Sequence, residues 1–202
     1  MAALHTAERI IREEHRALAS VLSSILLLLD AAAAGSAATD FTLLRAMLFY
    51  VDEFPERLHH PKESELLFAK LRERAPEARA VLDRLDHDHA RGEQSIRELQ
   101  HLLLGWEMLD DAPDGGLRRA AFERAARHYV RFYLEHMRCE EEDVLPLARR
   151  LLGEDDWQQL ARAFAANRDP LVSDHDTSYR PLFLRILHTA PAPIGLGEPK
   201  AA

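Results

Sequence analysis

The sequence predicts an all-α protein built as an antiparallel, up-down four-helix bundle. Alanine, leucine, arginine and glutamate dominate, and only 8 of the 202 residues are glycine. These common residues have high helix propensity. No stretch shows the convincing period-two alternation of polar and apolar residues that is typical of strands. Four long helical stretches joined by short loops favour the bundle, because short loops make successive helices antiparallel neighbours.

The first two helices are expected at about 6–34 and 40–74. Thr6 is the predicted N-cap of the first helix, because its hydroxyl can accept a hydrogen bond from a backbone N–H in the first turn. The second helix contains Pro55 and Pro61. Each proline removes a backbone donor, so this helix should bend or be interrupted at both positions.

The third and fourth helices are expected at about 76–109 and 117–152. Pro76 suits the first turn of a helix, where its missing N–H costs no hydrogen bond. Aspartate and glycine residues mark the loop at 110–116 between the two helices. The fourth helix should bend at Pro146.

Residues 1–152 are therefore expected to form the bundle, and residues 153–202 a helical extension with a tail. One extra helix is predicted at about 155–167, and a second segment at about 173–187 would cover one end of the bundle. The tail is rich in alanine, proline and glycine over 190–197, a composition typical of a flexible segment.

Composition limits the classes of function. The chain has 26 basic and 34 acidic residues, a net charge of −8, and no basic stripe, which argues against binding nucleic acid. The apolar run at 17–34 is interrupted by Asp30, so we expect a buried core helix and no membrane span or export signal. The single cysteine, Cys139, excludes an internal disulfide framework and suits a reducing cytoplasm.

Histidine and glutamate pairs recur on the predicted helices. His59 and Glu63 form one HxxxE pair, and His136 and Glu140 form a second. Residues four apart share one face of a helix, so each pair presents an imidazole beside a carboxylate. Two such pairs, together with His15 on the first helix and a histidine of the third, can hold two metal ions.

The third helix offers His87 and His89, which cannot both face the same way because they are two positions apart. At most one is expected to be a ligand, and the local pattern favours His89. Glu63 and Glu140 are the candidate bridging carboxylates of a dinuclear centre with an open position. Pro61 makes the first pair the less secure of the two, although a kink there could turn His60 inward.

The chain resembles the bacterial hemerythrin-like, HHE cation-binding domains over about residues 6–152. The resemblance rests on an ordered set of strings: EHRAL at 14–18, FPERLHHPKE at 54–63, DHARG at 88–92 and HMRCEE at 136–141. A further similarity, to the C-terminal extension of one bacterial branch, rests on Asp156-Trp157, on the stretch at 163–167 and on Asp169-Pro170-Leu171.

The resemblance implies a non-heme di-iron centre with oxo or hydroxo and carboxylate bridges, in which other divalent metals could replace iron. The ligands carried over are His15, His59, Glu63, His89, His136 and Glu140, with His60 as an additional ligand in some relatives. The third helix lacks the HxxxH of oxygen carriers, which argues against simple oxygen transport. Ser64 replaces an acidic residue that often follows Glu63, and this change should weaken the site slightly.

The leading hypothesis is a cytoplasmic, non-catalytic di-iron protein that senses, stores or buffers oxygen, nitric oxide or iron. The alternative is an enzyme, a di-iron oxidase or peroxidase acting on oxygen, peroxide or reactive nitrogen species. A third hypothesis, ranked last, is a helical interaction protein whose histidines are incidental. The expected partners are a small diatomic ligand and, if the bundle forms a homodimer, a second copy of the chain.

Overall fold

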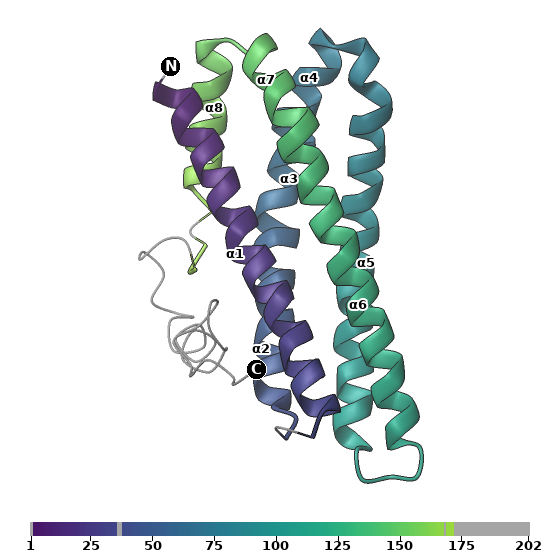
Figure 1. The fold of residues 1–202 in the computed structure, drawn as a ribbon. Helices are drawn as coiled ribbons and strands as arrows, with labels where there is room; N and C mark the ends of the chain where they lie inside the picture. Colours follow the sequence, from purple (N-terminus) through teal and green to yellow (C-terminus); the bar gives the residue numbers. More distant parts are fainter. Residues whose placement is uncertain (1, 36–37, 168, 172–202) are drawn as a thin grey trace.

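The computed structural model describes residues 2–35, 38–167 and 169–171, and every regular element among them is a helix. The predicted all-helical class is therefore confirmed. Figure 1 shows long helical rods lying side by side, with the shorter helix α8 against one end of α1. The segments expected at 173–187 and 190–197 lie outside the described residues.

The four rods and the added helix follow one another in chain order. The first rod is α1 (Ala2–Ala33). The second consists of α2 (Phe41–Val51), the π-helical η1 (Asp52–His59), α3 (His60–Lys62), the π-helical η2 (Glu63–Phe68) and α4 (Ala69–Arg74). The third is the 3₁₀ turn η3 (Pro76–Ala78) followed by α5 (Arg79–Met108). The fourth consists of α6 (Gly115–Cys139), the π-helical η4 (Glu140–Val144) and α7 (Leu145–Leu151), after which α8 (Glu154–Ala165) follows.

The helix starts agree with the expected ones except at the first helix. Helix α1 begins at Ala2, so the prediction of Thr6 as its N-cap is wrong, and Thr6 is an exposed residue within the helix. The alanine and leucine before Thr6 favour helix, and α8 packs along this part of the bundle. In α2, the predicted start is correct: the carboxylate of Asp40 accepts a hydrogen bond of 2.9 Å from the N–H of Leu43.

The second rod stays helical through both of its prolines, with Pro55 in a π-helical segment and Pro61 in the short α3. Pro55 lies inside η1, and the N–H of His60 donates to the carbonyl of Pro55, which is the five-residue spacing of a π turn. The π-helical segments η2 and η4 begin at Glu63 and Glu140. Isolated π turns inside α-helices often occur at functional sites, because they reorient side chains without ending the helix.

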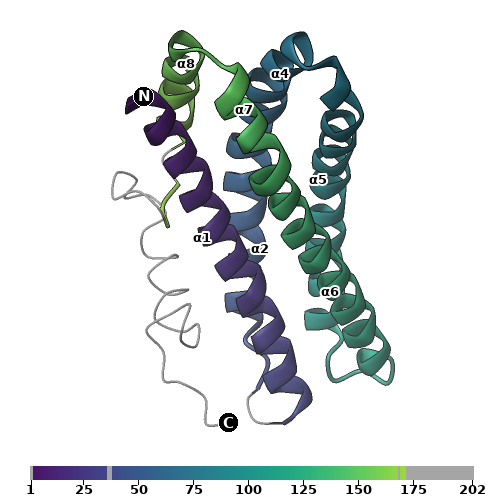
Figure 2. The same cartoon turned by 45° about the horizontal axis from the view of Figure 1, so that its top comes forward.

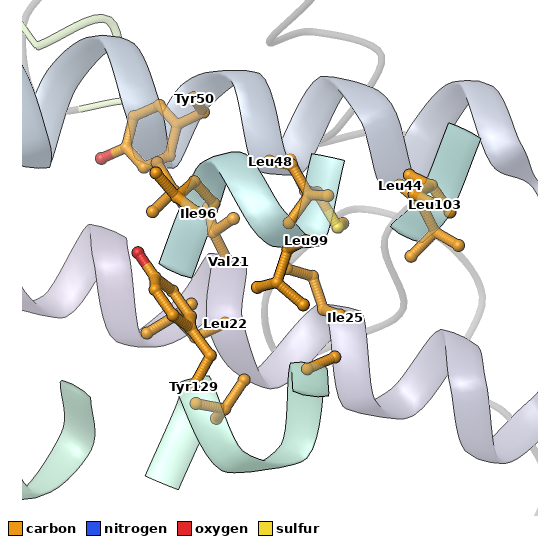
Figure 3. Close-up of a cluster of buried hydrophobic side chains, with 14 of the residues drawn as sticks. Val21, Leu22, Ile25, Leu44, Leu48, Tyr50, Ile96, Leu99, Leu103 and Tyr129 are labelled. Carbon is orange, nitrogen blue, oxygen red and sulfur yellow. The ribbon is translucent and has the colours of Figure 1, made fainter. Parts of the chain in front are cut away.

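Two apolar clusters fill the interior, one on each side of a polar layer. Figure 3 shows part of the larger cluster, in which Leu22 of α1, Leu48 of α2 and Leu99 of α5 pack together. The second cluster includes Ile11 of α1 and Phe68 of η2. Along α1, His15 lies between residues of the two clusters, so the fold holds the polar layer away from both ends of the bundle.

Helix α1 also has the length and apolarity of a membrane-spanning helix over Ala3–Ala33, alone among the helices of the described residues. Part of its apolar surface is buried in the larger cluster, including Leu22, Ile25 and Leu29, whereas Leu27 is exposed.

Helix α8 covers the first rod at the end where the bundle begins. Figure 2 shows α8 beside the start of α1 and close to α7. Trp157, Leu160 and Phe164 of α8 are buried in the second apolar cluster with Ile11. The extension is thus packed into the same core as the bundle.

Candidate metal centre

All seven side chains predicted as metal ligands lie together in the polar layer. Each is at least nine-tenths buried, and they come from all four rods. The seven are His15, His59, His60, Glu63, His89, His136 and Glu140. Of the two histidines left open on the third helix, His89 points into this layer, whereas His87 is exposed to solvent.

One half of the layer is formed by His15 and His59. Their Nε2 atoms are 3.1 Å apart. Glu63 Oε1 lies 3.1 Å from Nε2 of His59 and 3.7 Å from Nε2 of His15. Glu140 Oε2 lies 3.4 Å from Nε2 of His15. Two imidazoles and one oxygen from each carboxylate therefore face a common point.

The other half repeats this arrangement with the remaining oxygen of each carboxylate. The Nε2 atoms of His89 and His136 are 3.0 Å apart. Glu63 Oε2 lies 3.5 Å from Nε2 of His89, and Glu140 Oε1 lies 3.2 Å from Nε2 of His136. His60 stacks on His89 with ring centroids 4.4 Å apart and has a ligand atom within 4.8 Å of this group.

The carboxylate oxygens at the centre have no hydrogen-bond donor among the described residues. Both oxygens of Glu63 and both of Glu140 are buried and unpartnered. Buried polar atoms are almost always paired, because leaving them unpaired costs free energy. The donor set of imidazole and carboxylate suits iron, manganese or zinc. The residues present therefore form two buried groups that could hold a metal ion, one at His15, His59 and Glu63 and one at His60, Glu63, His89 and His136.

A second layer of polar groups holds the outward-facing nitrogen of the histidines. Four of the histidines have an Nδ1 within hydrogen-bond distance of an acceptor: His15 with Glu141 at 3.1 Å, His59 with Glu14 at 2.6 Å, His60 with Glu56 at 3.0 Å, and His89 with Ser64 at 2.9 Å. Such contacts keep the proton on Nδ1 and leave Nε2 as a ligand. The Nδ1 atom of His136 lies 3.7 Å from Asp88, beyond hydrogen-bond length.

The charges in the layer shift its titration strongly. Burial and the charge of Glu63 would raise the pKa of Glu140, but His136 and His89 lower that pKa to about 2. Burial would lower the pKa of His136, but the charge of Glu140 and the close approach of the Asp88 and Glu140 carboxylates raise it to about 10. Burial and the charges of neighbouring histidines hold the pKa of His60 well below its ordinary value. In the metal-free protein, protons therefore partly take the place of cations.

Two tyrosines stabilise the partner of His60. The hydroxyls of Tyr129 and Tyr133 donate to Glu56 Oε1 at 2.9 and 2.6 Å. The ring of Tyr133 stacks on His60, and its hydroxyl fits against Gly92, where any Cβ would overlap with it. Both tyrosines are therefore hydrogen-bond donors beside the centre.

Several residues of this outer layer were not predicted from the sequence. Glu56 could have been found, since it precedes His60 by four positions on the same rod. Glu14 and Glu141 neighbour predicted ligands in the sequence, but only the packing of α1 against the other rods shows which histidine each one contacts. Asn167 belongs to the stretch at 163–167 that carried the similarity of the extension, but that similarity gave no indication that the residue lies beside the centre. Ser64, expected to weaken the site, provides the hydroxyl that contacts His89.

A helical bundle that buries two histidine pairs around two shared carboxylates defines a class of cation-binding proteins. The family model described as the hemerythrin HHE cation binding domain matches residues 6–148. The chain therefore belongs to the hemerythrin HHE cation-binding family, which confirms the resemblance found in the sequence. Searches of curated proteins and of solved structures gave no match.

Proposed function

We propose that this chain is an antiparallel four-helix bundle protein that binds two iron ions and senses, stores or buffers oxygen, nitric oxide or iron. The observation that carries the proposal is the division of each central carboxylate: one oxygen of Glu63 and one of Glu140 face His15 and His59, and the other two face His89 and His136. A carboxylate shared in this way bridges two cations and offsets their repulsion.

Iron is the proposed metal because the resemblance to hemerythrin-like domains implies it, and the donor set of five imidazoles and two carboxylates without a thiolate is compatible with it. Manganese or zinc would satisfy the same donors. When bound, reduced iron supplies reversible binding or reduction of small molecules such as oxygen and nitric oxide. We also propose a cytoplasmic setting, in keeping with the single cysteine.

The two proposed metal positions differ in the number of protein donors. The position at His89 and His136 also has His60 within reach, whereas the position at His15 and His59 has no third histidine in its group. A small cavity with room for about one water-sized molecule lies against His15 and His59 and is lined further by Leu18 and Phe54. A larger, open pocket is lined by His60 and His89 of the other position. The smaller number of protein donors, and not the cavity, therefore favours the position at His15 and His59 as the site of a diatomic ligand.

The test is a matched pair of variants. We expect about two iron ions per chain in wild-type protein reconstituted anaerobically and measured by elemental mass spectrometry. His89→Ala should lose iron, whereas His87→Ala, which removes an exposed histidine two positions away, should retain both ions. Equal iron content in the two variants, or far less than two ions in the wild type, would overturn the proposal.

A second measurement separates binding from catalysis. Reduced, iron-loaded protein is exposed to oxygen, and the optical spectrum is recorded before and after deoxygenation. A change that reverses on deoxygenation supports binding. Sustained consumption of oxygen or peroxide over many equivalents would instead favour the oxidase or peroxidase alternative.

A further inference from the structure

The segment that follows the bundle reaches the metal centre. Phe164 of α8 contacts the ring of His59 edge to face, with centroids 5.4 Å apart. Asn167 and Asp169, just beyond α8, line the cavity beside His15 and His59. Both are buried, at 3% and 5% exposure. These residues lie beyond residues 6–148, which the family model matches.

Asn167 is held in one orientation by the bundle. Its side-chain amide donates two hydrogen bonds to Glu14, of 3.0 Å to Oε1 and 2.9 Å to Oε2. Its carbonyl oxygen accepts from the ammonium group of Lys62. A lysine ammonium can only donate, so this contact fixes which end of the amide faces Glu14.

Glu14 in turn fixes His59. Its Oε2 lies 2.6 Å from Nδ1 of His59. A carboxylate that accepts from Asn167 on both oxygens is oriented as an acceptor for the Nδ1–H of the imidazole as well. When His59 binds a metal, the proton on Nδ1 that faces Glu14 leaves Nε2, which lies 3.1 Å from Glu63 Oε1, without a proton. This is the tautomer that a metal ligand requires.

The residues that follow the bundle support only one of the two proposed metal positions. The contacts on Nδ1 of His60 and His89 come from Glu56 and Ser64, both within the second rod. Only the His59 contact is tied, among the described residues, to a residue that follows the bundle. The extension therefore acts on the position at His15 and His59 and not on the position at His60, His89 and His136.

From this geometry we propose that Asn167 is a positioning residue for one of the two metal ions, acting through Glu14 on His59. Helix α8 and Asn167 then support one of the two metal positions, and this proposal rests on the proposed two-ion function. Removing the amide should lower the affinity of the ion at His15 and His59 by about 10–100-fold, the usual cost of losing such a supporting contact. The ion at His89 and His136 should keep its affinity.

The experiment is a chelator titration of full-length, iron-loaded protein with Asn167→Leu and a control, Gln159→Leu, which removes an exposed amide from α8. Asn167→Leu should release one ion at lower chelator concentration and retain the second, whereas the control should match the wild type. In zinc-loaded protein, the NMR signal of the His59 Nδ1–H should exchange faster with solvent in Asn167→Leu than in the wild type. Wild-type affinity for both ions, or equal weakening of both, would overturn the inference.

Two further variants separate positioning from folding. Lys62→Met removes the hydrogen bond to the side-chain oxygen of Asn167 without altering the apolar contacts of α8. It should lower the affinity for the ion at His15 and His59 by a smaller factor than Asn167→Leu does. In a Glu14→Ala background, Asn167→Leu should have no further effect, because its route to His59 is already cut. An additional loss in that background would contradict the proposed route. Failure of the wild type to bind two ions would instead contradict the proposed function itself.

Discussion

Removing one shared carboxylate should affect both metal ions, whereas removing one histidine should affect only one. Glu63 directs Oε1 to His59 and Oε2 to His89, so Glu63→Ala removes a donor from both positions. His15→Ala removes a donor from one position and leaves His89, His136 and both carboxylates around the other. This difference is a direct consequence of the geometry of a bridging residue.

The size of the effect follows from linkage between binding and folding. A ligand at 100 times its Kd stabilises the folded state by about 2.7 kcal/mol per site. For a chain of this size, each kcal/mol raises Tm by about 2–4 °C. Each ion should therefore raise Tm by about 5–11 °C. The wild type should show the shift of two ions, His15→Ala the shift of one, and Glu63→Ala almost none.

The assay is thermal unfolding of each protein with and without ferrous iron under anaerobic conditions. Comparing the metal-dependent shift within each variant removes the effect of the substitution on the metal-free protein. Glu65→Ala, an exposed position two residues along the same rod, is the matched control and should behave as the wild type. A Glu63→Ala protein that keeps the shift of one ion would refute the bridging role.

Three further predictions concern the surroundings of the centre. Gly92→Ala should lower the free energy of unfolding by about 1–3 kcal/mol, because the added methyl displaces the hydroxyl of Tyr133 from Glu56; an unchanged urea midpoint would show that the tyrosine moves freely. The pKa of His136 is raised from 6.5 to about 10 in the folded protein, so its contribution to stability is complete below pH 6.5 and is lost as pH rises through about 10. The free energy of unfolding of the metal-free protein, measured in urea, should therefore fall over that range. A free energy of unfolding that does not change with pH there would contradict the assignment. Burial raises the pKa of Cys139 and leaves little thiolate, so its alkylation should be much slower in native than in urea-unfolded protein, and equal rates would show that the thiol is accessible.

The features of the fold and the site that depend on local residue spacing could be predicted from the sequence. Helix type and the approximate ends of the four rods follow from composition and from loop residues. The HxxxE spacing predicted that each glutamate would lie beside its histidine, as His136 and Glu140 do at 3.2 Å. The effect of Pro61 was harder to foresee, because π turns in the same rod keep His59 and Glu63 together and also bury His60.

The remaining features depend on contacts between elements distant in the sequence. The link from Asn167 to Glu14 joins residues 153 positions apart, and no local pattern predicts such a pair. The division of the Glu63 oxygens between two histidine pairs depends on how the four rods are positioned relative to one another along the bundle axis. The start of α1 before Thr6 likewise depends on contacts with α8. These contacts and the helix-favouring residues before Thr6 outweigh the local capping signal of Thr6.

The most direct test of the central claim is the anomalous scattering of iron in crystals of the metal-loaded protein. The proposed function predicts two iron peaks in the polar layer, one at His15 and His59 and one at His89 and His136, with Glu63 and Glu140 between them. A single peak, or peaks outside this layer, would contradict the dinuclear centre.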